Sequence, residues 1–282
     1  MNFYQFQEQF PNDDACLEHM LVTRYGGRQF HCPKCGALSK FYKVERDRAY
    51  VCQHCKHFIF PCVGTPMERS RTPLHKWFYA MYLFSTSRHG ISAKELERQV
   101  GVTYKTAWRM AHEIRKYMAE VDDEHPLDGD VEADETYIGG KRPGKRGRGA
   151  DGKAVVFGML ERGGELMAKV VPNVRKRTLQ PIIEENVLPG STMHTDELRS
   201  YLGLVRAGYR HRTVNHEAGE YSRNGCHVNT LEGFWARLKL SIQGTHVHVS
   251  PKHLWKYVKE FEYRYNRRKD PASIFSDLVE NL

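Results

Sequence analysis

Long hydrophobic runs are missing from this sequence. No stretch approaches the ~18 consecutive apolar residues that mark a membrane-spanning helix, and the first residues lack the basic and then apolar plan of a signal peptide. Internal repeats and low-complexity tracts are missing too, and nothing suggests wholesale disorder. We therefore expect a cytoplasmic protein that does not associate with a membrane.

Acidic residues are fewer than basic ones. The chain has 34 Asp and Glu against 43 Lys and Arg, which gives a net charge of +9 and a pI near 9.1. This balance suits a polyanionic partner, either nucleic acid or an anionic membrane surface. With 282 residues, of which 40% are hydrophobic, two or three modules with real cores are expected.

The cysteines do not resemble the disulfide framework of a secreted protein, because their number is odd and four of them form two tight pairs. Two CxxC motifs turn four thiolates toward one point, which is the tetrahedral set that zinc prefers. A redox pair is the competing interpretation. Because no ligand position is left open, we expect one structural Zn²⁺. Its ligands are Cys32, Cys35, Cys52 and Cys55.

Residues 73–118 have the periodicity of three helices. Ser92, with Glu95 three residues later, predicts the start of the second helix as a capping box, and Thr103 predicts the start of the third. The tight turn between them indicates a helix-turn-helix, although a simple three-helix packing unit has the same pattern. In a helix-turn-helix, Lys105 and Arg109 would lie where a recognition helix contacts DNA.

The rest of the chain has an α/β pattern that predicts a mixed sheet with flanking helices. The expected strands are 131–138, 154–160, 165–172, 192–194 and 210–215. The expected helices are 178–187, one that begins near Glu197, 229–242 and 251–265.

Three carboxylates stand out in this part. Asp134 lies in the middle of an apolar strand, on the same face as Glu132 and Thr136, where a metal ion is the best compensation for its charge. Asp196 follows a short strand, at the end where α/β sheets present functional groups. Glu232 lies on a helix, pointing away from its apolar stripe.

Each carboxylate alone is more typical of a surface charge or a helix cap, but the combination predicts a site for two hard cations, Mg²⁺ or Mn²⁺. Such ions sit ~3.5–4 Å apart, where one activates water or a 3′-hydroxyl and the other stabilises the leaving oxygen. We expect the acids to repel one another when no metal is bound.

Basic residues follow the strand of Asp134 directly. A run of positive charge is usually a solvated surface, but beside carboxylates that act on a phosphodiester it favours phosphate contacts. The residues expected to contact DNA here are Lys141, Arg142, Lys145, Arg146 and Arg148.

These motifs together resemble the DDE transposases of the bacterial insertion-sequence 1595 family. The resemblance covers nearly the whole chain. Beyond the cysteine pairs, it rests on residues 64–67, 72–77, 92–96, 101–108, 134–141, 194–196, 214–216, 220–221, 227–239 and 260–267.

The resemblance implies an RNase H-like catalytic domain in which Asp134 and Asp196 are the first two acids. In this family the third position is Asn or Glu, followed by a Lys, and the chain offers both Asn229 and Glu232. We prefer Glu232, because a carboxylate binds a hard cation better than an amide. Lys239, two helical turns later on the same face, would hold a phosphate or a DNA end.

The predicted order is a zinc ribbon (1–66), a helix-turn-helix (67–120), an acidic linker (121–130), the catalytic domain (131–270) and a tail (271–282). The first two modules would bind terminal inverted repeats, and the third would cleave and join DNA in the nucleoid of a bacterial cytosol. A homo-oligomer is expected, because two element ends must be handled together. The alternatives are a nuclease that never joins DNA, and a domesticated transposase or regulator that only binds it.

Overall fold

The computed structural model describes residues 1–122, 125–139, 153–214, 222–223 and 225–282. These residues form two compact units. The first unit combines Met1–Val121 with Asp270–Leu282, and the second comprises Asp122–Lys269. No helix in the described ranges has both the length and the apolar character needed to cross a membrane.

The first unit begins with two helices that the sequence did not predict, α1 (Phe3–Gln9) and α2 (Asp13–Tyr25). The side chains of Asn2 and Asn12 accept backbone N–H groups in the first turns of α1 and α2, as N-cap residues do. A four-stranded antiparallel sheet follows. Its strands are β1 (Gln29–His31), β2 (Leu38–Lys43), β3 (Tyr50–Cys52) and β4 (Phe58–Ile59).

Three helices complete the main part of this unit, as the sequence predicted: α3 (Leu74–Thr86), α4 (Ala93–Val100) and α5 (Tyr104–Glu120). Ser92 and Thr103 cap α4 and α5, and Gly101 ends α4 in the left-handed conformation. The reciprocal bond of a capping box is not formed by Glu95, whose carboxylate instead accepts hydrogen bonds from Arg98 and Gln99.

The last twelve residues, for which the sequence predicted a tail, contain α9 (Ser273–Glu280). This helix packs with α2 and α3. Phe275 is buried and makes edge-on contacts with Phe6 and Phe10. The end of the described chain therefore belongs to the core of the first unit.

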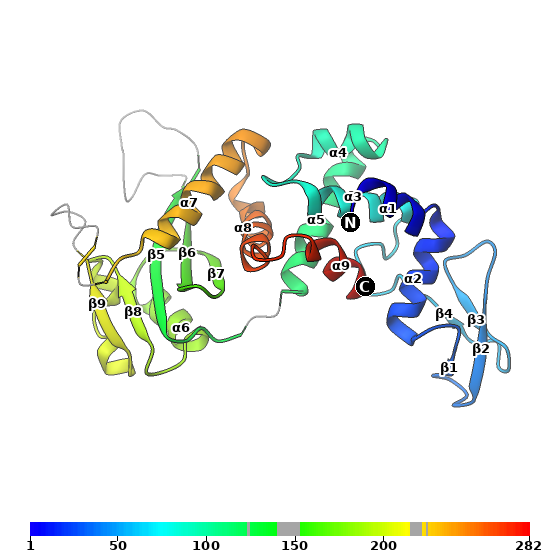
Figure 1. Ribbon diagram of the computed structural model, residues 1–282, viewed down its shortest axis with the longest axis horizontal. Helices are drawn as coiled ribbons and strands as arrows, with labels where there is room; N and C mark the ends of the chain where they lie inside the picture. The colour runs from blue at the N-terminus through cyan, green and yellow to red at the C-terminus, as the bar shows by residue number, and fades with distance from the viewer. Residues whose placement is uncertain (123–124, 140–152, 215–221, 224) are drawn as a thin grey trace. The chain divides into compact units, whose positions relative to one another are not determined.

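The second unit is built on a mixed sheet with the strand order β7-β6-β5-β8-β9 (Figure 1). β5 lies in the middle, antiparallel to β6 and parallel to β8. This confirms the predicted mixed sheet. The strands are β5 (Asp130–Ile138), β6 (Ala154–Glu161), β7 (Leu166–Val171), β8 (Thr192–Thr195) and β9 (Arg210–Thr213).

Helices cover both faces of this sheet. Leu179 and Ile183 of α6 (Lys176–Asn186) pack on one face, against Val131 and Ala133. The other face carries α7 (Asn229–Ser241), its π-helical continuation η3 (Ile242–His246) and α8 (Pro251–Asn266). Because side chains alternate along β5, its even-numbered residues face α7.

After Asp196 the chain forms two short 3₁₀ turns, η1 (Arg199–Tyr201) and η2 (Leu204–Ala207), instead of the predicted helix. Gly203 and Gly208 flank η2 with positive φ, which interrupts helical geometry. The predicted helix is therefore wrong at this point.

Candidate active site

Asp134 lies on β5 opposite Gly158 of β6, on the face that carries α7. Its carboxylate Oδ2 accepts a hydrogen bond of 3.0 Å from the indole N–H of Trp235 on α7. A Cβ atom added to Gly158 would lie 2.7 Å from the Trp235 ring. The glycine therefore leaves the space in which the indole reaches Asp134.

Asp196 stands directly after β8, as predicted. β5 and β8 run parallel with Glu132 opposite His194, so two residues further along both strands Asp134 and Asp196 come side by side. Asp196 is buried, and its Oδ1 accepts the backbone N–H of Leu198 at 2.9 Å. This bond fixes the orientation of the second carboxylate.

Glu232 lies in the first turn of α7 and is partly exposed. The helix is held to the sheet by the predicted apolar stripe, whose members Leu231, Phe234, Trp235 and Leu238 are buried. Glu232 precedes Trp235 by three residues, close to one helical turn. The helix that supplies the bond to Asp134 therefore also carries the third acid.

The charges of the other two acids act on Asp134. Burial is the main reason that the pKa of Asp134 rises to about 7, and the negative charges of Glu135, Asp196 and Glu232 raise it further. A divalent cation would relieve this repulsion and compensate the desolvated charge. The donor set, which consists of carboxylate oxygens, fits hard cations.

The carboxylates are not gathered as tightly as the ligands of a single ion. Within the described residues, the group with all ligand atoms within 4.8 Å of one another is the cysteine cluster.

Asn229 and Lys239 lie at opposite ends of α7. Asn229 is its first residue and is exposed. Lys239 is partly buried, which lowers its pKa, whereas Asp134 acts to raise it. Lys239 also lines a cavity of about 350 Å³ beside the end of β5. The ammonium group of Lys239 therefore lies close enough to Asp134 to interact with its charge. A phosphate bound beside Asp134 could form an ion pair with this ammonium group.

Glu132 shares the face of Asp134, as predicted, but its charge is compensated without metal. Its carboxylate pairs with Arg162 at 3.0 Å and accepts hydrogen bonds from the first turn of α7. Sequence reasoning did not identify these contacts or the bond from Trp235. A buried indole N–H requires an acceptor, and the position of Trp235 beside Glu232 was the available signal.

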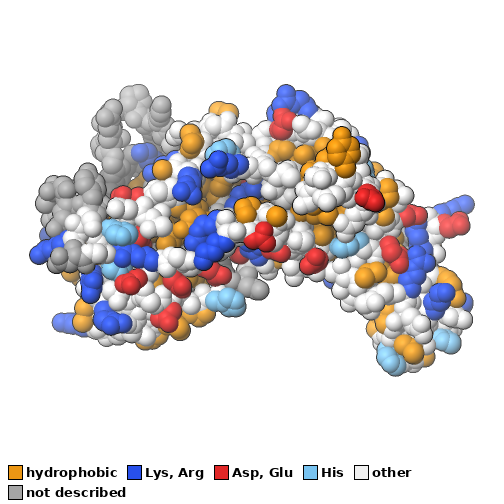
Figure 2. All heavy atoms as spheres, viewed as in Figure 1, with side chains coloured by type: hydrophobic (Ala, Val, Ile, Leu, Met, Phe, Trp, Pro, Cys, Tyr) orange, Lys and Arg blue, Asp and Glu red, His pale blue; other side chains and the backbone are white. Residues whose placement is uncertain are grey.

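The predicted DNA contacts after β5 lie outside the described residues: Lys141, Arg142, Lys145, Arg146 and Arg148. On α5, Lys105 is exposed, as a DNA contact requires. Arg109 instead donates to the Ser70 hydroxyl at 2.9 Å and lies over the Trp77 ring. Lys and Arg side chains reach the surface at several points of both units in the view of Figure 2.

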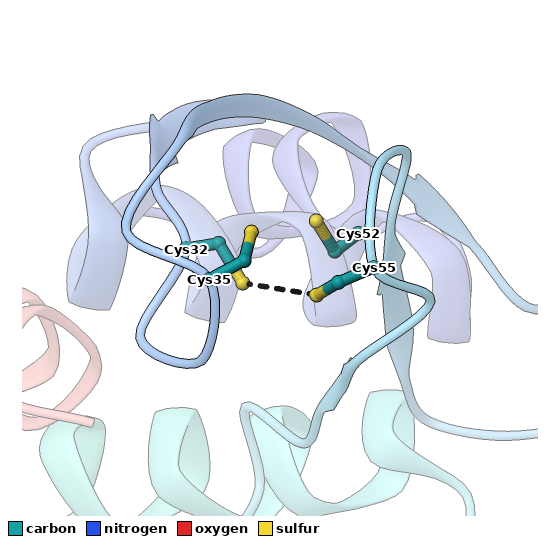
Figure 3. Close-up of side chains that lie close together, drawn as sticks. All are labelled: Cys32, Cys35, Cys52 and Cys55. Carbon is teal, nitrogen blue, oxygen red and sulfur yellow. Dashed lines mark hydrogen bonds between the residues drawn. The ribbon is translucent and has the colours of Figure 1, made fainter.

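The two cysteine pairs of the first unit face each other from two loops (Figure 3). Cys32 Sγ and Cys55 Sγ are 3.7 Å apart, close to the ~3.8 Å edge of a tetrahedron with Zn–S bonds of ~2.3 Å. The Ser39 hydroxyl lies 3.1 Å from Cys52 Sγ. Burial acts to raise the pKa of Cys52, but hydrogen bonds from Ser39 and nearby backbone groups outweigh it and bring the pKa to about 6. The cluster therefore suits zinc.

Comparison with known proteins identifies two domains in this chain. The ISXO2-like transposase domain matches residues 126–266, and a transposase zinc-ribbon domain matches residues 11–58. This chain belongs to the ISXO2-like transposase family of insertion elements. The transposase therefore has a structural zinc site and an activity of the nuclease or transferase kind, as its family implies.

Two curated relatives support this assignment. A protein of the transposable element ISH50 of Halobacterium salinarum is 31% identical over 265 residues, covering 86% of this chain and 87% of its own. A transposase-like protein of Haemophilus influenzae is 36% identical over 113 residues, covering 39% of this chain and 90% of its own. The first match spans both units, so the similarity is not confined to one domain.

Proposed function

We propose that this transposase cleaves phosphodiesters at the ends of its insertion sequence and joins the 3′-hydroxyl ends to target DNA. Asp134, Asp196 and Glu232 would hold two divalent cations, Mg²⁺ or Mn²⁺. The observation that carries the proposal is the position of Asp134: the β5–β8 register brings Asp196 beside it. Burial is the main reason that the pKa of Asp134 is raised, and the charges of Glu135, Asp196 and Glu232 add to it.

An RNase H-like fold of the second unit is part of the proposal. The first strand of the sheet, β5, is central. On one side β6 pairs antiparallel with β5 and β7 pairs antiparallel with β6, and on the other side β8 and β9 run parallel to β5. The first acid lies on this central strand, and the second lies just after the adjacent parallel strand. This placement would let Glu232 on α7 face both Asp134 and Asp196.

The bound cations would supply Lewis acidity to the reacting oxygens, both for cleavage and for joining. The chain's own residues hold the geometry. Trp235 fixes one oxygen of Asp134, and Leu198 fixes one oxygen of Asp196. Lys239 would bind a phosphate of the DNA end. Asn229 is the alternative third ligand, and replacing Asn229 and Glu232 separately distinguishes them.

DNA recognition is assigned to the first unit. α4 and α5, joined across Gly101–Thr103, would act as a helix-turn-helix in which the exposed Lys105 contacts the terminal repeat. The zinc ribbon would add affinity for the same ends. Handling two ends together requires a homo-oligomer on the DNA, in the nucleoid of a bacterial cytosol.

Replacing Asp134 with alanine tests the proposal. We expect cleavage of element ends and joining of a pre-cut 3′-hydroxyl end to fall below detection with Mg²⁺, while binding of the ends in a mobility-shift assay is retained. The exposed Asp270, changed to alanine, serves as the control and should keep both activities.

Wild-type protein that cleaves but never joins would be a nuclease, and protein that binds ends but does neither would be a DNA-binding regulator. Full activity of Asp134→Ala would overturn the assignment of the acids.

A further inference from the structure

Glu132 caps a helix that belongs to a distant part of the chain. Its side chain is 0% exposed, and Oε2 accepts the backbone N–H groups of Thr230 and Leu231, each at 3.0 Å. Oε1 accepts the Thr230 hydroxyl, also at 3.0 Å. The first N–H groups of a helix have no partner within it, and Val228 at the N-cap position of α7 makes no side-chain cap bond. The strand β5 therefore supplies the missing cap.

Arg162 ties the same carboxylate to the segment that precedes α7. Its Nε donates to Glu132 Oε1 at 3.0 Å, while its two terminal nitrogens donate to the carbonyl oxygens of Gly225 and His227, both at 2.8 Å. One planar guanidinium thus holds three acceptors in a fixed arrangement. A buried carboxylate is costly unless it is paired and hydrogen-bonded. The contacts of Glu132 with Arg162 and with the first turn of α7 are therefore needed to keep this carboxylate buried.

These donors occupy the acceptor capacity of Glu132. An ionised carboxylate offers about four lone-pair positions. The guanidinium, the Thr230 hydroxyl and two backbone N–H groups account for them, and His227 Nδ1 also lies 3.1 Å from Oε1. Glu132 therefore has no oxygen to offer a cation, although it shares its face of the strand with Asp134.

A second bond, from Trp235 to Asp134, attaches α7 to β5 further along. The two attachment points are two residues apart on the strand, or ~6.6 Å. They are five residues apart on the helix, from Thr230 to Trp235, or ~7.5 Å. The two spacings are similar, so both hydrogen-bonded contacts can form between the first turns of α7 and β5. Glu232 lies between them.

We propose that Glu132 and Arg162 form a positioning clamp that sets Glu232 against Asp134 for cation binding, without either residue contacting cation or DNA. The inference rests on the proposed function, because it assumes that these acids bind the cations. It assigns the most buried acid of the strand to the geometry of the site and not to its chemistry.

Glu132→Gln in the full-length transposase tests the clamp, because it keeps the size of the side chain and removes the charge that faces Arg162. We expect faster hydrogen exchange of the amides of residues 229–235. We also expect about 10- to 100-fold weaker binding of Tb³⁺, a hard-cation probe followed by tryptophan-sensitised luminescence, which is the usual effect of disturbing groups behind metal ligands. Cleavage with Mg²⁺ should fall to a similar extent and recover in part with Mn²⁺, since Mg²⁺ demands the stricter geometry.

Glu262→Gln is the matched control. Glu262 is also fully buried, pairs with Lys259 at 2.6 Å and accepts the N–H of Ala168 at 2.9 Å, but it lies on α8. Its replacement should lower the unfolding temperature and leave Tb³⁺ affinity and the ratio of Mg²⁺ to Mn²⁺ activity unchanged. If Glu132→Gln unfolds the protein, Thr230→Val removes only the hydroxyl bond and should shift the same readouts less.

Unchanged exchange at 229–235 and unchanged Tb³⁺ affinity in a folded Glu132→Gln variant would overturn the clamp, as would a response identical to that of Glu262→Gln. Failure of the proposed function gives a different result, since Asp134→Asn would then bind Tb³⁺ as tightly as the wild type.

Discussion

At the scale of single residues, the surroundings of Asp134 act on the protonation of its carboxyl group in opposite directions. Burial and the nearby charges of Asp196 and Glu232 favour its protonated form, whereas the hydrogen bond from Trp235 favours the ionised form. Trp235 also fixes the direction of one carboxylate oxygen. A cation bound here would find one oxygen of Asp134 already oriented by Trp235, and its positive charge would favour the ionised carboxylate.

The raised pKa of Asp134 predicts how the metal-free protein responds to pH. The carboxyl group of Asp134 has a pKa of about 7 in the folded protein, against an ordinary value of 3.8. It therefore binds more protons in the folded state and stabilises the fold at low pH. That contribution is lost as pH rises from about 4 to about 7. We expect the unfolding temperature of the cation-free second unit to fall over this range, and to fall less in Asp134→Asn.

Calorimetry in the presence of a chelator measures this difference. Glu262, whose burial raises its pKa to about 7, should preserve part of the pH dependence in the variant. Identical pH profiles for wild type and Asp134→Asn would show that Asp134 ionises normally.

At the scale of elements, the approach of α7 to the sheet decides the geometry of the site. Leu231 and Trp235 pack over Gly158, where a Cβ atom would lie 3.2 Å from Leu231 and 2.7 Å from the Trp235 ring. The contact involves a rigid indole rather than the end of a flexible chain. Helix and strand therefore come as close as this glycine permits.

Gly158→Ala should force α7 away from β5. Overpacking of this kind costs about 1–3 kcal/mol, and the displaced indole would no longer reach Asp134. Urea unfolding should show the loss of stability, and the Mg²⁺-dependent activity should fall with it.

Gly233→Ala provides the comparison on α7 itself. A Cβ atom at Gly233 meets nothing within 4 Å, so higher helix propensity should stabilise the protein by about 0.5–1 kcal/mol. Equal effects of the two substitutions would contradict the importance of the close packing at Gly158.

At the scale of the whole molecule, the two units are stabilised in different ways. The second has apolar layers on both faces of its sheet, formed by α6 on one side and by α7 and α8 on the other. The ribbon at β1–β4 has only short strands, and a module of this size gains much of its stability from bound metal. Zinc removal should therefore affect the units unequally.

Cys35→Ser tests this inequality. Cys35 is exposed, so without a metal role its replacement would change stability by no more than about 0.5 kcal/mol. We expect loss of bound zinc and a drop of at least about 10 °C in the unfolding temperature of the first unit, equivalent to roughly 2 kcal/mol. The transition of the second unit should stay in place.

Metal analysis and calorimetry follow both effects, with a zinc chelator on the wild type as the parallel experiment. A folded Cys35→Ser protein that keeps its zinc and its unfolding temperature would exclude Cys35 as a ligand.

Some of this molecule follows from local sequence alone. The cysteine spacing predicts the cluster, Ser92 and Thr103 predict the starts of α4 and α5, and alternation around Asp134 predicts β5, because these patterns depend on neighbours a few residues apart. Helices α1, α2 and α9 were not predicted. Phe6 and Phe275 show why: their partners are aromatic residues far away in the sequence.

Only the tertiary structure shows which carboxylates have their charge compensated by the chain itself. In sequence, Glu132 and Asp134 are equivalent carboxylates on one face of a strand, and periodicity cannot separate them. Folding places Arg162 and the first turn of α7 against Glu132, and places Trp235, Asp196 and the field of Glu232 around Asp134. The local pattern determined where carboxylates stand. The long-range contacts compensate the charge of Glu132 and leave Asp134 surrounded by other acids. This difference makes Asp134 the better candidate to bind a cation.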